Sequence, residues 1–461
     1  MKKYSMLMAL VFCCVRLPLV AQSGEEAGAL PVAPLAKVDL SQTGSAAAGA
    51  SSGQLQQLTR AEAERLAIQN NPRISVGRLL ALAQHQAVKE AQSANLPTLD
   101  GDITAVDSED GSRLSAGTLS ASRLLTHAAA GANLTQLLTD FGRTHNLILA
   151  QKLEEKAANA NALATKQEIV LATDEAFYHA LSAQAILQVA KQTVATRQTT
   201  DTQVSQLTRN NLKSTLDLSF ADVNLSQARL LQLDAEGDAG AAMAALDSML
   251  GLDHSVNYEL IDDTTPLTAQ PPDAEQLIQM ALQQRPDLQA SSYDQQSSQK
   301  YARAEWEQLL PTITAAGTAG TVPIRSSEYE ENWWGAVGVN MNIPIFNGFL
   351  YSSQAKAAEY KAQAAQERSR DLRDQIVRDV RTAWLQANTA YQRVGVTAQL
   401  AKEANQALQL AQTRYTLGLS SIVELSQAQL QQTSAAIDNT NAEYQYRLAL
   451  AAVNYQVGAT P

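Results

Sequence analysis

The class of this protein turns on residues 333–344, which read WWGAVGVNMNIP. Alternate positions form two different faces: Trp333, Val337, Val339 and Met341 on one side, and small or polar residues such as Asn340 on the other. A period of two is typical of a β-strand, and this division fits a strand with lipid on one face and water on the other. The paired tryptophans fit an interfacial aromatic belt. We therefore expect four lipid-facing residues: Trp333, Val337, Val339 and Met341.

Residues 312–325 form the expected partner strand, and residues 326–332 form the loop between the two. Earlier in the chain, residues 98–107 and about 126–138 form a second expected pair across a longer Gly/Ser loop. Four strands are too few to close a membrane barrel, which needs at least about 8. Two, three or four copies would supply enough strands to share one barrel, and strand counting does not choose among them.

The two strand pairs belong to an internal repeat. The segment 96–98, Leu-Pro-Thr, recurs at 310–312, and the Asn71-Pro72 step corresponds to Arg285-Pro286 with the same offset of 214 residues. Further along, the offset is 207, so the second copy is seven residues shorter. A duplication this long predicts one body made of two similar halves, not a solenoid of short units.

Each half also predicts one very long helix. Residues 141–208 and 349–416 contain no proline and are rich in Ala, Gln, Leu and Glu. Their apolar residues recur every three or four positions, as in Ile376, Val380 and Ala383. Helices of about 68 residues would each span roughly 100 Å. That length favours a coiled coil or a tube over the alternative of an ordinary antiparallel bundle.

The N-terminus predicts export. Residues 1–21 combine Lys2 and Lys3 with a short apolar run and are expected to be a signal peptide. Cys13 and Cys14, the only cysteines, lie inside it, and the residue before each is not small, which disfavours a lipid anchor. The expected organisation continues with a flexible leader (22–57), a first repeat (58–253), a linker (254–272), a second repeat (273–457) and a short tail (458–461).

Composition excludes several function classes. The formal net charge is −11 and no Lys/Arg cluster is present, so no nucleic acid is expected as a partner. The five histidines are scattered without an i, i+4 pair, so no metal site is expected. No nucleophile or phosphate-loop motif occurs, which predicts a protein that is not an enzyme and has no cofactor.

At this level the repeat resembles the TolC-like outer membrane efflux proteins. The motifs are Leu-Pro-Thr before a strand, Ile-Pro-Ile-Phe-Asn-Gly at 343–348, and Arg-Tyr-Thr-Leu-Gly at 414–418. The resemblance implies a mainly α fold with a membrane β-barrel, in which a homotrimer shares 12 strands and the helices form a periplasmic tunnel. It implies a passive exit duct in outer membrane lipid, serving a tripartite efflux pump or a type I secretion system. Its partners would be a periplasmic adaptor (membrane fusion) protein and an inner-membrane transporter.

The resemblance also assigns residues to the tunnel entrance. Acidic side chains on the helix after the second tip would form a constriction, and Glu424 occupies the first such position. The second position, one turn further, is Gln427 instead of an acid. Three copies of Glu424 would bring three carboxylates together and favour cations.

A lock between the two tips, which would also contact the adaptor, is implied as well. Tyr415 near the second tip and Asp217 near the first match the family pattern, beside Arg414, but the expected arginine two residues after Gly418 is Ser420. The lock is therefore expected to be weaker or built differently. Gly418 gives the second turn its backbone freedom, and Asn211 takes that place in the first turn because Asn tolerates positive φ best after Gly.

Two rival classes remain at this stage. An exported periplasmic coiled-coil spacer or adaptor without a barrel would have the same helices but no apolar strand face. A soluble hydrolase or binding module would need a convergent polar pocket, which the sequence does not indicate. The alternation in residues 333–344 favours the membrane channel over both.

Overall fold

The computed structural model describes residues 56–107, 113–116, 119–123, 126–252, 258–262, 272–325 and 331–459. The chain divides into two units, Met1–Gln54 and Leu55–Pro461, and every described residue belongs to the second. The expected signal peptide and nearly all of the expected leader lie outside the described residues. No described helix is both long enough and apolar enough to cross a membrane.

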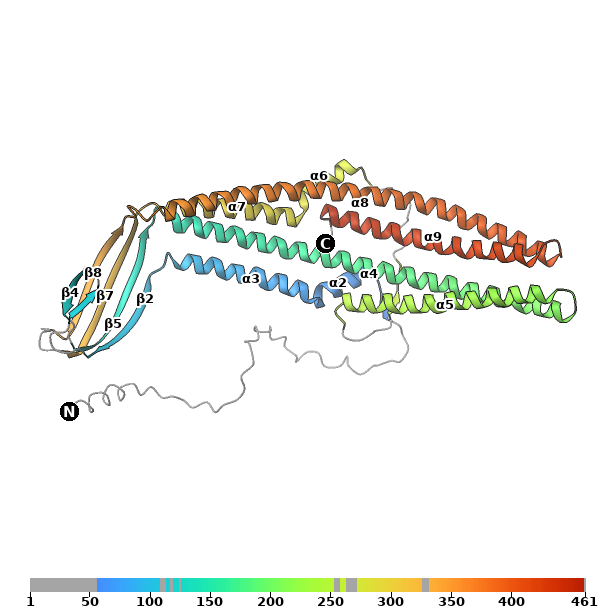
Figure 1. Cartoon of the computed structure of the whole chain (residues 1–461), viewed down its shortest axis with the longest axis horizontal. Coiled ribbons are helices and arrows are strands. Elements are labelled where there is room, and N and C mark those ends of the chain that lie inside the picture. The colour runs from blue at the N-terminus through green and yellow to red at the C-terminus, as the bar shows by residue number, and fades with distance from the viewer. Residues whose placement is uncertain are drawn as a thin grey trace, which may run out of the picture. The chain divides into compact units, whose positions relative to one another are not determined.

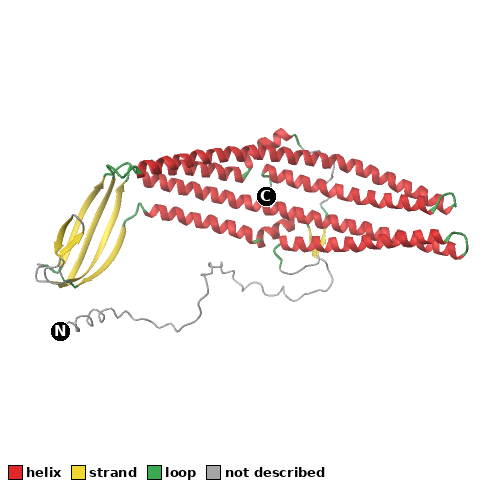
Figure 2. Cartoon of the chain, in the orientation of Figure 1, coloured by secondary structure: helices red, strands yellow, loops and turns green. Residues whose placement is uncertain are grey.

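Each half of the chain has two shorter helices, then strands, then a very long helix and a second long helix (Figures 1 and 2). Among the described residues, the helices are α2 (Arg60–Asn70), α3 (Pro72–Ser93), α4 (Arg143–Arg209), α5 (Thr215–Met249), α6 (Ala274–Gln284), α7 (Pro286–Glu307), α8 (Leu350–Thr416) and α9 (Ile422–Val457). The strands are β1 (Gln56–Leu58), β2 (Thr98–Val106), β3 (Arg113–Ala116), β4 (Leu119–Arg123), β5 (His127–Thr139), β6 (Tyr258–Leu260), β7 (Thr312–Arg325) and β8 (Trp333–Asn342).

The internal repeat is confirmed by helix lengths. Helices α2 and α6 each have 11 residues, α3 and α7 each have 22, and α4 and α8 each have 67, while α5 and α9 have 35 and 36. The two repeated X-Pro steps have a local cause. Pro72 and Pro286 occupy the first position of α3 and α7, where proline loses no hydrogen bond, and each ends the helix before it.

One antiparallel sheet combines strands from both halves. Its order is β2-β5-β7-β8, so the β5–β7 pair joins the first repeat to the second while β2 and β8 form the two edges. In Figures 1 and 2 this sheet lies at one end of the long helices, and the α4–α5 and α8–α9 turns lie at the other. The four strands expected from the sequence are therefore confirmed within one or two residues.

The register gives this sheet two different faces. One cross-strand row is apolar or small and consists of Val337, Gly317, Leu134 and Leu99. The next row lies on the opposite face and consists of Ala336, Thr318, Asn133 and Asp100. On that polar face, the Thr318 hydroxyl donates to Asn133 Oδ1 at 2.6 Å, and Asn133 Nδ2 donates to Asp102 at 2.5 Å. The opposite face is open in the single chain, where Val337 is 92% exposed.

Two pairings were not expected from the sequence. The Gly/Ser-rich connection between β2 and β5 was interpreted as a loop, but it contains the short antiparallel pair β3–β4. Strand β1 pairs in parallel with β6, so the end of the expected leader and part of the expected linker belong to the folded body. Three-residue strands carry too little periodicity to be recognised, and a parallel partner about 200 residues away leaves no local trace.

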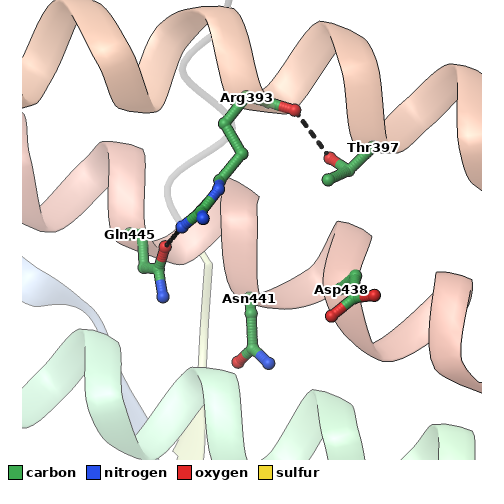
Figure 3. Close-up of a pocket in the computed structure, with 5 residues that line it drawn as sticks. All are labelled: Arg393, Thr397, Asp438, Asn441 and Gln445. Atoms are coloured by element: carbon green, nitrogen blue, oxygen red, sulfur yellow. Dashed lines mark hydrogen bonds between the residues drawn. The ribbon is translucent and has the colours of Figure 1, made fainter.

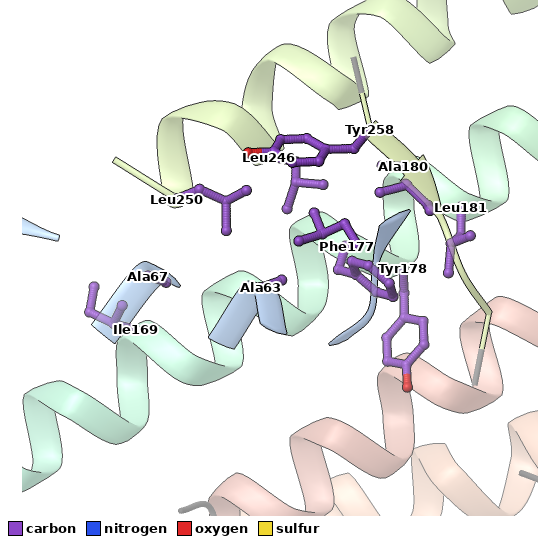
Figure 4. Packing of buried hydrophobic residues seen from close by; sticks show 12 residues of the cluster. Ala63, Ala67, Ile169, Phe177, Tyr178, Ala180, Leu181, Leu246, Leu250 and Tyr258 are labelled. Carbon is purple, nitrogen blue, oxygen red and sulfur yellow. The ribbon is translucent and has the colours of Figure 1, made fainter. Parts of the chain in front are cut away.

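The main apolar core lies where this small sheet meets the helices. Phe177 of α4 is fully buried there with Leu246 of α5 and Leu250 directly after that helix (Figure 4). Leu58 of β1 belongs to the same cluster. The equivalent core of the second half contains Ile376, the counterpart of Ile169 at an offset of 207 residues. Alanines separate the large side chains in both cores, which allows close helix packing.

Candidate functional site at the helix tips

Two short turns at the ends of the long helices bring together most of the predicted site residues. The α4–α5 turn places Asn211 at φ 57°, and the α8–α9 turn places Gly418 at φ 74°. In each turn the following leucine N–H bonds back to a carbonyl five residues earlier: Leu212 to Leu207 and Leu419 to Arg414, both at 2.8 Å. This is the geometry of a Schellman cap, which needs one residue in the left-handed region. The tolerance of Asn for positive φ thus explains how the first tip turns without glycine.

Serine begins the next helix at each tip, but the two acidic side chains are used differently. Ser214 and Asp217 form a reciprocal capping box, in which Asp217 Oδ2 accepts from the Ser214 N–H at 3.2 Å and from its hydroxyl at 3.1 Å. Ser421 caps α9 through the Glu424 N–H at 3.4 Å. Among the described residues, the Glu424 carboxylate makes no capping bond and pairs with a different group.

That partner is Arg414, at the end of α8. Arg414 Nε lies 3.1 Å from Glu424 Oε1, and its Nη2 donates to the Leu419 carbonyl at 3.4 Å. The two side chains are 54% and 46% exposed, so the pair contributes little to stability. The pair instead changes the local charge, because the Arg414 guanidinium partly neutralises the Glu424 carboxylate. Gln427, one turn further along α9, is exposed.

Tyr415 lies inside the contact between the two hairpins. It is buried with Val204 of α4 and Leu425 of α9, and its hydroxyl has no hydrogen-bond partner among the described residues. Burial raises the pKa of Tyr415, and the nearby negative charge of Asp217 raises it further. The tyrosine and aspartate of the expected lock are therefore neighbours without a hydrogen bond between them.

Sequence reasoning missed one member of this site. Lys213, at the first tip, places its ammonium 4.3 Å from the centre of the Tyr415 ring. At the offset of 207 residues, Lys213 corresponds to Ser420, whose buried hydroxyl oxygen has no hydrogen-bond partner in the described part of the chain. The repeat alignment could have identified Lys213 from the sequence, because it places a basic residue at the first tip opposite Ser420 of the second tip.

A second polar cluster lies far from the tips, between α2 and α4. Arg60 Nη1 lies 2.8 Å from Glu64 and 3.3 Å from Asp174, and both carboxylates are almost fully buried. Burial and the charge of Glu64 raise the pKa of Asp174 to about 7, although Arg60 opposes the shift. This cluster can change its protonation near neutral pH.

A cavity of about 330 Å³ opens between α8 and α9 (Figure 3). It is lined by five residues with polar side chains: Arg393, Thr397, Asp438, Asn441 and Gln445. Arg393 Nη1 donates to Gln445 at 3.1 Å, and the Thr397 hydroxyl donates to the Arg393 carbonyl at 2.9 Å. Both of these bonds involve Arg393, and the five lining residues offer no nucleophile–base pair.

Comparisons with known proteins agree with this architecture. The family model described as "Outer membrane efflux protein" matches residues 64–252 and 277–459. The outer membrane protein TolC of Vibrio cholerae is 24% identical over 90% of this chain and 94% of its own length, and the TolC of Salmonella enteritidis is 22% identical over 72% and 69%. The solved outer-membrane channel OprN superposes with a TM-score of 0.75 at 18% identity, covering 87% of this chain and 90% of its own.

Proposed function

The chain belongs to the outer membrane efflux protein family and is a channel protein of the bacterial outer membrane; we propose that it is the exit duct of a tripartite efflux pump or a type I secretion system. In this role it forms a homotrimer and passes substrates from an inner-membrane transporter to the exterior. The transporter supplies the energy, and a periplasmic adaptor (membrane fusion) protein connects it to the duct.

The observation that carries this proposal is the open four-stranded sheet. Its edges β2 and β8 have no partner strand in the described part of one chain, and unpaired edges are not tolerated in lipid. If β8 of one copy pairs with β2 of the next, three copies close a barrel of 12 strands. The apolar row that contains Val337 then faces lipid, and the polar row that contains Asn133 faces water.

The tips then form the periplasmic entrance. In a trimer, three Glu424 carboxylates converge with three Gln427 amides one turn further into the tunnel. The remaining tip residues are proposed to close the entrance and contact the adaptor: Asn211, Asp217, Arg414, Tyr415, Gly418 and Ser420. Because Arg414 lies 3.1 Å from Glu424, the ring of acids is partly neutralised within each chain, and only a moderate cation preference is expected.

The test combines assembly with conduction. The mature chain is extracted from isolated outer membranes in detergent, its native mass is measured, and it is reconstituted into planar bilayers. A trimer that forms ion-conducting channels is the expected result. A monomer or dimer in the soluble periplasmic fraction would contradict the proposal and favour the coiled-coil spacer. A trimer that does not conduct would contradict the channel role alone.

A further inference from the structure

A lysine of the first tip, the α4–α5 turn, contacts an aromatic ring at the second tip, next to the α8–α9 turn. The Lys213 ammonium lies 4.3 Å from the centre of the Tyr415 ring, within the range of a cation–π contact. Lys213 belongs to the α4–α5 turn and Tyr415 to the last turn of α8, so the contact joins two separate hairpins. Tyr415 is only 6% exposed, which fixes the ring in position.

The ring of Tyr415, and not its hydroxyl, makes this contact. The hydroxyl has no hydrogen-bond partner among the described residues, and Asp217 uses its Oδ2 atom in the capping box of Ser214. Tyr415 and Asp217 are therefore not joined by a hydrogen bond in this structure. The ammonium of Lys213 instead contacts the face of the Tyr415 ring.

The repeat explains why a lysine lies here. Lys213 and Ser420 are equivalent positions of the two tips, at the offset of 207 residues. The second tip has Ser420 where a basic residue was expected. The first tip has Lys213 at the equivalent position, and its ammonium contacts Tyr415 of the second tip. The charge is thus retained at the junction, although it comes from the opposite hairpin.

We propose that Lys213, through its contact with the Tyr415 ring, adds to the packing between the two tips and keeps the entrance closed. This inference rests on the proposed channel function. A partly buried cation–π contact biases an equilibrium by roughly 2- to 30-fold per chain. Its loss should let the α8–α9 hairpin move away from the α4–α5 hairpin and widen the entrance.

The experiment compares single-channel conductance of purified trimers in planar bilayers. Lys213→Gln removes the cation and is expected to raise the mean conductance several-fold. Arg209→Gln is the matched control, because it removes a cation of the same tip that is exposed and lies at the end of α4; its conductance should equal that of the unmodified channel. Native mass confirms that each variant remains trimeric.

A second set of variants separates the ring from the hydroxyl. Tyr415→Leu removes the ring and should raise the conductance, whereas Tyr415→Phe removes only the hydroxyl and should change it less than twofold. The double variant Lys213→Gln/Tyr415→Leu should have the same conductance as the single variant with the larger increase, because both substitutions remove the same contact. The proposal is overturned if Lys213→Gln leaves conductance unchanged, if Arg209→Gln raises it equally, or if Tyr415→Phe matches Tyr415→Leu. Absence of conduction in the unmodified protein would instead defeat the proposed function.

Discussion

Replacing Gly320 by Ala should destabilise the sheet, because this glycine provides the space for an indole ring. Gly320 on β7 pairs with Trp334 on β8 and with Gly131 on β5. A Cβ atom added at Gly320 would lie 2.7 Å from Trp334 Cζ2 and 2.6 Å from the Ala130 carbonyl oxygen. Carbon atoms in comfortable contact are about 3.5–4.0 Å apart, so a shift of about 1 Å is required.

The cost of that shift follows from which atoms must move. The indole of Trp334 can rotate, but the Ala130 oxygen belongs to the backbone of a paired strand and cannot move without disturbing the β5–β7 ladder. Overpacking of this kind costs about 1–3 kcal/mol of unfolding free energy. We therefore expect the proposed trimer to dissociate, in the Gly320→Ala variant, at a temperature a few degrees below that of the unmodified protein in detergent.

Gly338→Ala is the matched control. Gly338 lies on the same face of the sheet as Trp334, four residues further along β8, and an added Cβ would meet nothing within 4 Å. Dissociation is followed by heat-dependent mobility on detergent gels, and tryptophan fluorescence reports displacement of the indole. Equal thermal midpoints for the two variants would refute the steric argument.

Three further predictions concern pH, lipid contact and selectivity. The pKa of Asp174 is raised from 3.8 to about 7, so the folded protein binds this proton more tightly than the unfolded chain does. The free energy of unfolding should therefore fall as the pH rises from 5 to 7, by at most about 1.4 kcal/mol per pH unit from this group. Asp174→Asn should flatten that pH dependence in urea unfolding. Val337→Asp should block assembly into the outer membrane while Asn340→Asp is tolerated; the reverse pattern would mean that the faces are assigned wrongly. Glu424→Gln should lower the cation preference measured from reversal potentials. An unchanged cation preference would mean that Glu424 does not set the ion selectivity of the entrance.

The regular elements could be predicted from the sequence because their signals are local. The two long helices follow from proline-free runs with apolar residues every three or four positions, and α4 and α8 begin and end within two residues of the expected bounds. The alternation in residues 333–344 identified β8 and assigned Val337 and Asn340 to opposite faces. The constant offsets between repeats supplied the weaker strands of the first half.

The contacts between distant segments were decided only by the tertiary structure. The backbone conformation of Asn211 follows from its own chemistry, but the meeting of Lys213 with Tyr415 depends on how two hairpins, 202 residues apart in the chain, pack and rotate against each other. The same holds for Asp174, whose pKa is set by burial under α2. Hydrophobic period and backbone preference act over a few residues, so the sequence by itself determined the helices, strands and repeat. Burial and charge environment arise when separate elements pack, so only the fold determined which side chains share a site.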